Sequence, residues 1–168
     1  METGIEKLCN RIDAFNERVG TLASWIVLVM AGITFLVAVM RYGFNFGRIA
    51  MQESITYLHA FVFMIAGAYT LKHNEHVRVD IFYQGMSRQN RAKVDFLGSV
   101  FLLLPFAGFI MWTSFDYVTN SWKYLEASRE AGGLPLVFVL KSLIPAMATL
   151  LFVQAVSMGG RAWLAWRK

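Results

Sequence analysis

The sequence is poor in the residues that build disulfide-linked, metal-binding or catalytic domains. Its 168 residues include one cysteine, three histidines and three prolines, and only 16% of them are charged. Because Cys9 stands alone, an internal disulfide framework and a multi-cysteine metal site are excluded. Hydrophobic residues make up 57% of the chain, more than the roughly 45–50% of a soluble domain. This composition indicates a membrane protein.

Apolar residues gather in long runs that predict four transmembrane helices. The predicted spans are about 20–40, 53–71, 95–116 and 136–162. Each run can cross a hydrocarbon core about 30 Å thick at about 1.5 Å per residue. A buried helix bundle of a soluble protein would carry a polar stripe along each helix, and these runs have none. The predicted fold class is an all-α integral membrane protein, with residues 1–168 forming one membrane domain.

The distribution of lysine and arginine predicts the orientation of the spans. One side of the membrane receives Lys7, Arg11, Arg18, Lys72, Arg78, Arg88, Arg91, Lys93, Arg161, Arg167 and Lys168, and the other only Arg41, Arg48, Lys123 and Arg129. The positive-inside rule places the richer side, with both termini, in the cytoplasm. Trp122 and Tyr124 near the outer face and Trp163 and Trp166 near the cytoplasmic face are expected to anchor the membrane interfaces.

Residues 3–19 predict an amphipathic helix before the first span. Thr3 and Glu6 have the spacing of a capping box. A hydrophobic stripe follows at helical spacing, made up of Ile5, Leu8, Cys9, Ile12, Phe15 and Val19. On largely the opposite side lie Lys7, Asn10, Arg11, Asn16 and Glu17. We expect this helix to lie in the cytoplasmic interface. A helix packed on a partner subunit is the alternative.

Few residues could carry chemistry. His73 and His76 share a helical face, but two imidazoles without further ligands make a weak metal site. His59 lies inside the second span, where a hydrogen bond to a neighbouring helix is the preferred interpretation. No nucleophile and base can be placed at one membrane depth. The sequence predicts no catalytic, substrate-binding or metal site, and no enzyme.

Charged residues at the ends of the spans are the informative ones. Arg41 ends the first span and Glu53 begins the second, so the two are expected to pair at the outer face. Lys141, near the start of the fourth span, is expected to reach the outer surface or an acid among Asp116, Glu126 and Glu130. Pro135 is expected in the first turn of the fourth helix. No chain of polar groups crosses the membrane, and no span is broken as transporter substrate sites require.

Short motifs in order give the chain a resemblance to a known family. The motifs are Arg41-Tyr42, Gln52-Glu53-Ser54, the run 76–80 (His-Val-Arg-Val-Asp), Ser128 followed by Gly133-Leu134-Pro135, and Ile144-Pro145. With the size and four spans, they resemble the DctQ-like small membrane subunit of tripartite ATP-independent periplasmic (TRAP) transporters. Where the family often has a tryptophan and two acids, this chain has Met51-Gln52-Glu53-Ser54, so a role that needs two carboxylates is doubtful.

The resemblance implies a function that spacing alone does not. Such a subunit supports a large DctM-like, elevator-type membrane subunit, which binds sodium and an organic acid delivered by a periplasmic binding protein. The expected location is the cytoplasmic membrane of a bacterium or archaeon. No cofactor other than bound phospholipid is expected in this chain, and no nucleic acid. The expected structural or interface residues are Arg41, Glu53, His59, His76, Arg78, Asp80, Ser128, Pro135 and Lys141.

A second class of protein fits the span count. A membrane anchor of a respiratory enzyme, carrying haem or quinone, would also cross the bilayer several times. Haem ligation requires histidines at matching depth on facing helices. All three histidines of this chain fall on or beside the second predicted span, which argues against this alternative.

Overall fold

The computed structural model describes residues 3–76, 81 and 83–167, and every regular element among them is a helix. In chain order these are α1 (Gly4–Phe44), α2 (Ile49–Ile65), α3 (Gly67–Lys72), α4 (Arg88–Leu97), the π-helix η1 (Gly98–Leu103), α5 (Leu104–Lys123) and α6 (Val137–Trp166). Four continuous helices, Gly4–Phe44, Ile49–Lys72, Arg88–Lys123 and Val137–Trp166, are long and apolar enough to span a membrane. They contain the four predicted spans, except that the fourth helix begins one residue later than predicted.

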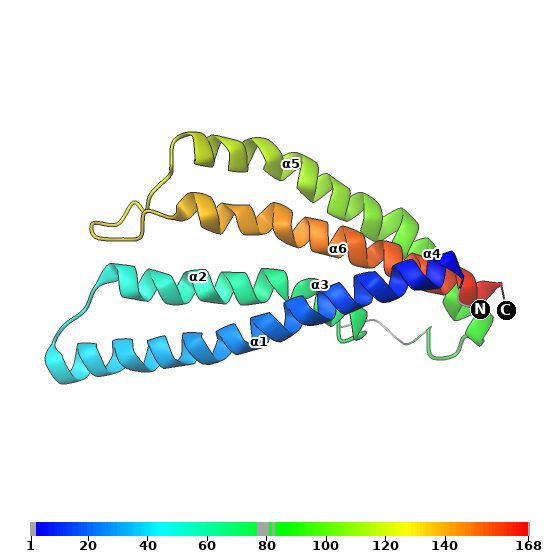
Figure 1. Ribbon diagram of the computed structural model, residues 1–168, viewed down its shortest axis with the longest axis horizontal. Helices are drawn as coiled ribbons and strands as arrows, with labels where there is room; N and C mark the ends of the chain where they lie inside the picture. Colours follow the sequence, from blue (N-terminus) through cyan, green and yellow to red (C-terminus); the bar gives the residue numbers. More distant parts are fainter. Residues whose placement is uncertain (1–2, 77–80, 82, 168) are drawn as a thin grey trace.

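Both termini lie at one end of the molecule (Figure 1). We call this the terminal end, and the opposite end, formed by the loops 45–48 and 124–136, the loop end. The prediction that an even number of spans returns the chain to its starting side agrees with this arrangement. Trp122 and Tyr124 fall at the loop end, while Trp163 and Trp166 fall at the terminal end beside Phe96. The two expected aromatic belts are thus separated along the helices.

The first helix differs from its prediction. The capping box is confirmed, since the Thr3 hydroxyl accepts from the Glu6 N–H and the Glu6 carboxylate accepts from the Thr3 N–H. The amphipathic stretch is not a separate element, because α1 continues without a break into the first span. Its 41 residues make a rod about 60 Å long, about twice the hydrocarbon thickness. Figure 1 shows α1 curving only gently along the molecule.

Helix α6 is the centre of the fold. It packs against every other helical element, whereas α5 contacts only α6 and η1 among the described elements. Helices α1 and α2 form a second antiparallel pair, which reaches α5 only through α6. At the loop end the four helices therefore fan out side by side rather than closing into a bundle (Figure 1).

The interior is built from small residues and the surface from large apolar ones. Seven of the ten buried hydrophobic residues among the described ones are alanine. Large side chains such as Phe35, Phe63 and Trp112 are 71, 74 and 84% exposed. In lipid this pattern is expected, because close approach of backbones rather than hydrophobic burial drives helix association. The same surface would make a soluble protein aggregate.

The spanning helices have local distortions but no unwound segment among the described residues. Ala66 interrupts α2–α3, yet its N–H still bonds Val62 O and its own carbonyl accepts from the Thr70 N–H. Pro145 lies inside α6, where it removes one backbone donor without ending the helix. The expectation that no span is broken around a substrate site agrees with these helices.

Candidate functional site

The terminal end is held by a polar cluster between α1 and α6. Asp13 Oδ1 accepts hydrogen bonds from Ser157 Oγ at 2.7 Å and Gln154 Nε2 at 3.1 Å. Its Oδ2 accepts from Arg161 Nε at 2.8 Å and Nη2 at 2.5 Å. Asn16 Nδ2 donates to Gln154 Oε1 at 2.6 Å, with both residues buried. Such contacts specify how two helices meet in an apolar surrounding.

At this terminal cluster the structure changes part of the expected pattern of faces on α1. Asn16 is 0% exposed rather than on the polar side, while Leu8 and Phe15 of the hydrophobic stripe are 52 and 53% exposed. Cys9 of the same stripe is buried on α6 with Asn16, and Lys7 and Arg11 are exposed as expected. The reason is that small and hydrogen-bonding side chains allow close helix contact, whereas large apolar ones are best left to lipid or a partner.

A second contact joins α1 to the end of α3. The Glu17 carboxylate pairs with the Lys72 ammonium and lies 2.9 Å from His73 Nε2. One turn further along α1, a Cβ on Gly20 would stand 2.2 Å from Tyr69 Cδ2. Glycine is therefore required at position 20 for the close approach of the two helices.

At the loop end Glu53 holds the 124–136 loop rather than Arg41. Its Oε1 accepts a hydrogen bond from the Ser128 hydroxyl and its Oε2 accepts from the Leu134 N–H at 2.6 Å. Arg41 takes part in none of the ion pairs found in the described part of the chain. The predicted Arg41–Glu53 pair is wrong, because the fold brings a loop 75 residues away onto the start of α2.

Lys141 meets one of its three expected acids. Its Nζ lies 2.5 Å from Glu126 Oε2 and 3.9 Å from the centroid of the Tyr117 ring. Glu126 also accepts from Ser121 Oγ at 2.7 Å. The hydrogen bond from Lys141, aided by that from Ser121, holds the pKa of the Glu126 carboxyl below its usual value. Glu53 and Glu126 thus both join the 124–136 loop to helix ends.

Three other predicted residues, His59, His76 and Pro135, can be located in the fold, and two lie outside the described residues. His59 is exposed on α2 and stacks on Phe63 with ring centroids 6.4 Å apart; no hydrogen bond joins it to another described helix, against expectation. His76 Nε2 lies 3.2 Å from Gly67 O. Pro135 precedes the first turn of α6, which begins at Val137, so its predicted place inside that turn is wrong by two residues. Arg78 and Asp80 lie outside the described residues.

Sequence reasoning missed the residues that lock the terminal end. Gln154, Ser157 and Arg161 follow the spacing of one helical face in α6, and Asp13 and Asn16 follow it in α1. The signal available was Gln154, a polar amide deep in the fourth span, where an unpaired side chain would be costly. Nothing in the sequence, however, identifies Asn16, 138 residues away, as its partner.

The described polar groups form clusters at both ends of the molecule and no path between them. No group of three or more His, Cys, Asp or Glu side chains that could hold a metal occurs among the residues searched. These polar side chains attach helices and a loop to one another. Fold and site together define a helical multi-pass membrane protein whose polar residues organise its own helices.

Comparison with known families makes this class specific. The family described as tripartite ATP-independent periplasmic transporters, DctQ component, matches residues 30–165. The chain belongs to this family, and the resemblance of its motifs is confirmed. It is accordingly a multi-pass membrane protein of a transporter component family. No curated protein and no solved structure matches the chain.

Proposed function

We propose that this chain is a scaffold subunit that does not itself transport, and that it supports the large, elevator-type subunit of a TRAP transporter. The complex takes up an organic acid, driven by sodium and delivered by a periplasmic binding protein. The chain has no enzymatic role, and its terminal end faces the cytoplasm. Membership of the DctQ family supports the general role.

The open arrangement of the helices is the observation that carries the proposal. Apart from η1, helix α5 contacts only α6 among the described elements, and its other faces, like those of α1, carry exposed large apolar side chains. A chain that moved a solute across the bilayer by itself would need polar or broken-helix sites at mid-depth. The fan of helices instead provides a broad apolar surface to a neighbour.

Positive charge near the terminal end supports the cytoplasmic assignment. Arg88, Arg91 and Arg161 line a cavity of about 380 Å³ between α3, α4 and α6 at this end. Basic side chains in this position favour the leaflet rich in anionic lipid headgroups. A cysteine placed at exposed Lys7 should react with a membrane-impermeant maleimide in inverted vesicles and not in intact cells. The reverse labelling would overturn the orientation.

Assembly is tested by co-expressing the tagged chain with a large TRAP permease subunit and a periplasmic binding protein from the same organism. We expect the large permease to co-purify with the chain in mild detergent at equal stoichiometry. An unrelated four-span membrane protein carrying the same tag serves as the control. Recovery of the permease at the control level would overturn the proposed function.

A further inference from the structure

A single carboxylate is exposed on α5 beside the large apolar side chains of Trp112 and Phe115. Asp116 is exposed on α5, and no hydrogen bond or ion pair to its carboxylate occurs within residues 3–76, 81 and 83–167. The basic side chain closest along the fourth span, Lys141, is paired with Glu126 instead. Asp116 is therefore left for something outside this chain.

The aromatic belts place Asp116 within the hydrocarbon core. The rings of Phe96 and Trp163 are 5.3 Å apart, which sets Phe96 at the level of the terminal-end belt. From Phe96 to Trp122 the helix runs about 39 Å. A hydrocarbon core about 30 Å thick, centred between the two belts, therefore ends about 4 Å before Trp122. Asp116 is about 9 Å from Trp122 along the axis and lies a few ångströms inside the core. A charge at this depth faces a protein interior or a partner.

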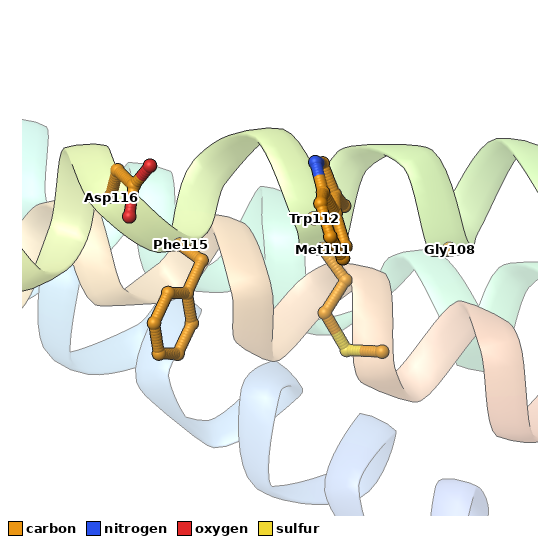
Figure 2. A pocket seen from close by; sticks show the side chains of 5 residues that line it. All are labelled: Gly108, Met111, Trp112, Phe115 and Asp116. Carbon is orange, nitrogen blue, oxygen red and sulfur yellow. The ribbon is translucent and has the colours of Figure 1, made fainter.

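The surface beside Asp116 is hollow and able to receive another helix. Gly108, Met111, Trp112, Phe115 and Asp116 line a cavity of about 540 Å³, and all five belong to two turns of α5 (Figure 2). A Cβ on Gly108 would meet nothing within 4 Å. Small residues at such positions let the backbones of two spanning helices approach closely, while Trp112 provides a large contact area.

We infer that this α5 cavity receives a transmembrane helix of the large subunit, which presents a lysine or arginine to Asp116. The inference rests on the proposed function and identifies the surface and the chemistry of the contact. Charge complementarity selects the occupant, because neither lipid tails nor the described residues of this chain form an ion pair with Asp116. The paired aspartate then fixes the register of the two subunits.

Cross-linking tests the location of the contact. A benzophenone amino acid at position 112 should cross-link to the large subunit in the intact complex. The same amino acid at position 35, equally open on α1, is the matched control and should not cross-link to it. Cross-linking at 35 with none at 112, in a complex that still co-purifies, would overturn the α5 contact but leave the proposed function standing. Failure of the native chain to co-purify would overturn both.

Substitutions test the charge. Asp116→Asn should lower the recovery of the large subunit about fivefold, and Asp116→Glu less than about twofold. Gly108→Leu fills the cavity and should act like Asp116→Asn, whereas Gly32→Leu, on an equally open glycine of α1, should not. Melting of the isolated chain should be unchanged by Asp116→Asn, since its carboxylate holds nothing within the chain. Native recovery with Asp116→Asn, or equal loss with Gly32→Leu, would contradict the inference.

Discussion

The two ends of the molecule are held together in different ways. At the terminal end, polar side chains of α1 and α6 bond directly across a helix interface, around Asp13 and Gln154. At the loop end, Glu53 and Glu126 bond the 124–136 loop to helix ends, and α5 reaches neither α1 nor α2. Polar side chains join α1 to α6 at the terminal end, whereas at the loop end they join a loop to helix ends and α5 stays clear of α1 and α2. The open end therefore depends less on its own packing and offers more surface to a partner.

Removing Asp13 should have the largest effect on the chain. Asp13→Ala leaves Gln154, Ser157 and Arg161 without their shared acceptor, which we expect to lower the free energy of unfolding by about 2 kcal/mol. Thermal unfolding of the purified chain in detergent measures the loss. Arg11→Ala, on the exposed side of the same helix, is the control and should leave the melting temperature unchanged. Equal melting of the two variants would show that the terminal cluster does not hold α1 to α6.

A side chain at Gly20 tests the close approach of α1 to α3. In Gly20→Ala, the new Cβ would clash with the ring and the Cβ of Tyr69. The two helices must therefore separate, at a cost of about 1.5 kcal/mol. Gly32→Ala meets nothing within 4 Å and should be neutral or slightly stabilising, because alanine favours helix. Circular dichroism melts of both variants give the comparison. A stable Gly20→Ala variant would mean that the contact yields easily.

Loss of the Glu53 carboxylate should loosen the loop end more than it destabilises the chain. Glu53→Gln keeps one acceptor oxygen but loses the charge, so we expect a small fall in the melting temperature and faster proteolysis within 124–136. Arg41→Gln should change neither, since Arg41 pairs with no acid among the described residues. Limited proteolysis followed by mass spectrometry measures the cleavage. If Arg41→Gln exposed the loop as much as Glu53→Gln, the assignment of Glu53 to the loop would be wrong.

The smallest effect expected is a pH dependence of the same loop. Because Lys141 and Ser121 lower the pKa of Glu126 in the folded state, its contribution is complete above the ordinary glutamate pKa of 4.5. The contribution is lost as the pH falls through the lower folded-state pKa. Proteolysis of the loop should therefore increase in acid in the native chain, and Glu126→Gln should weaken this increase. An unchanged acid response in the variant would assign it to another group.

The sequence predicts the local features of this structure but not the contacts between distant segments. Hydropathy predicts the four spans and the return of the chain to one side, because both depend on local composition. The Thr3 cap is also local, and it forms. Proximity in the sequence predicts Arg41 as the partner of Glu53, but the groups that bond Glu53 come from the loop after α5. The Asn16–Gln154 bond needs two helices at the two ends of the chain to meet, which no local pattern encodes.

Uptake by reconstituted proteoliposomes tests the scaffold role most directly. Vesicles would contain the chain alone, the large permease alone, or both, with the binding protein and a labelled organic acid added outside. We expect sodium-driven uptake only when both membrane subunits are present, and none when potassium replaces sodium. Uptake by the chain alone, or full uptake by the permease without it, would contradict the account.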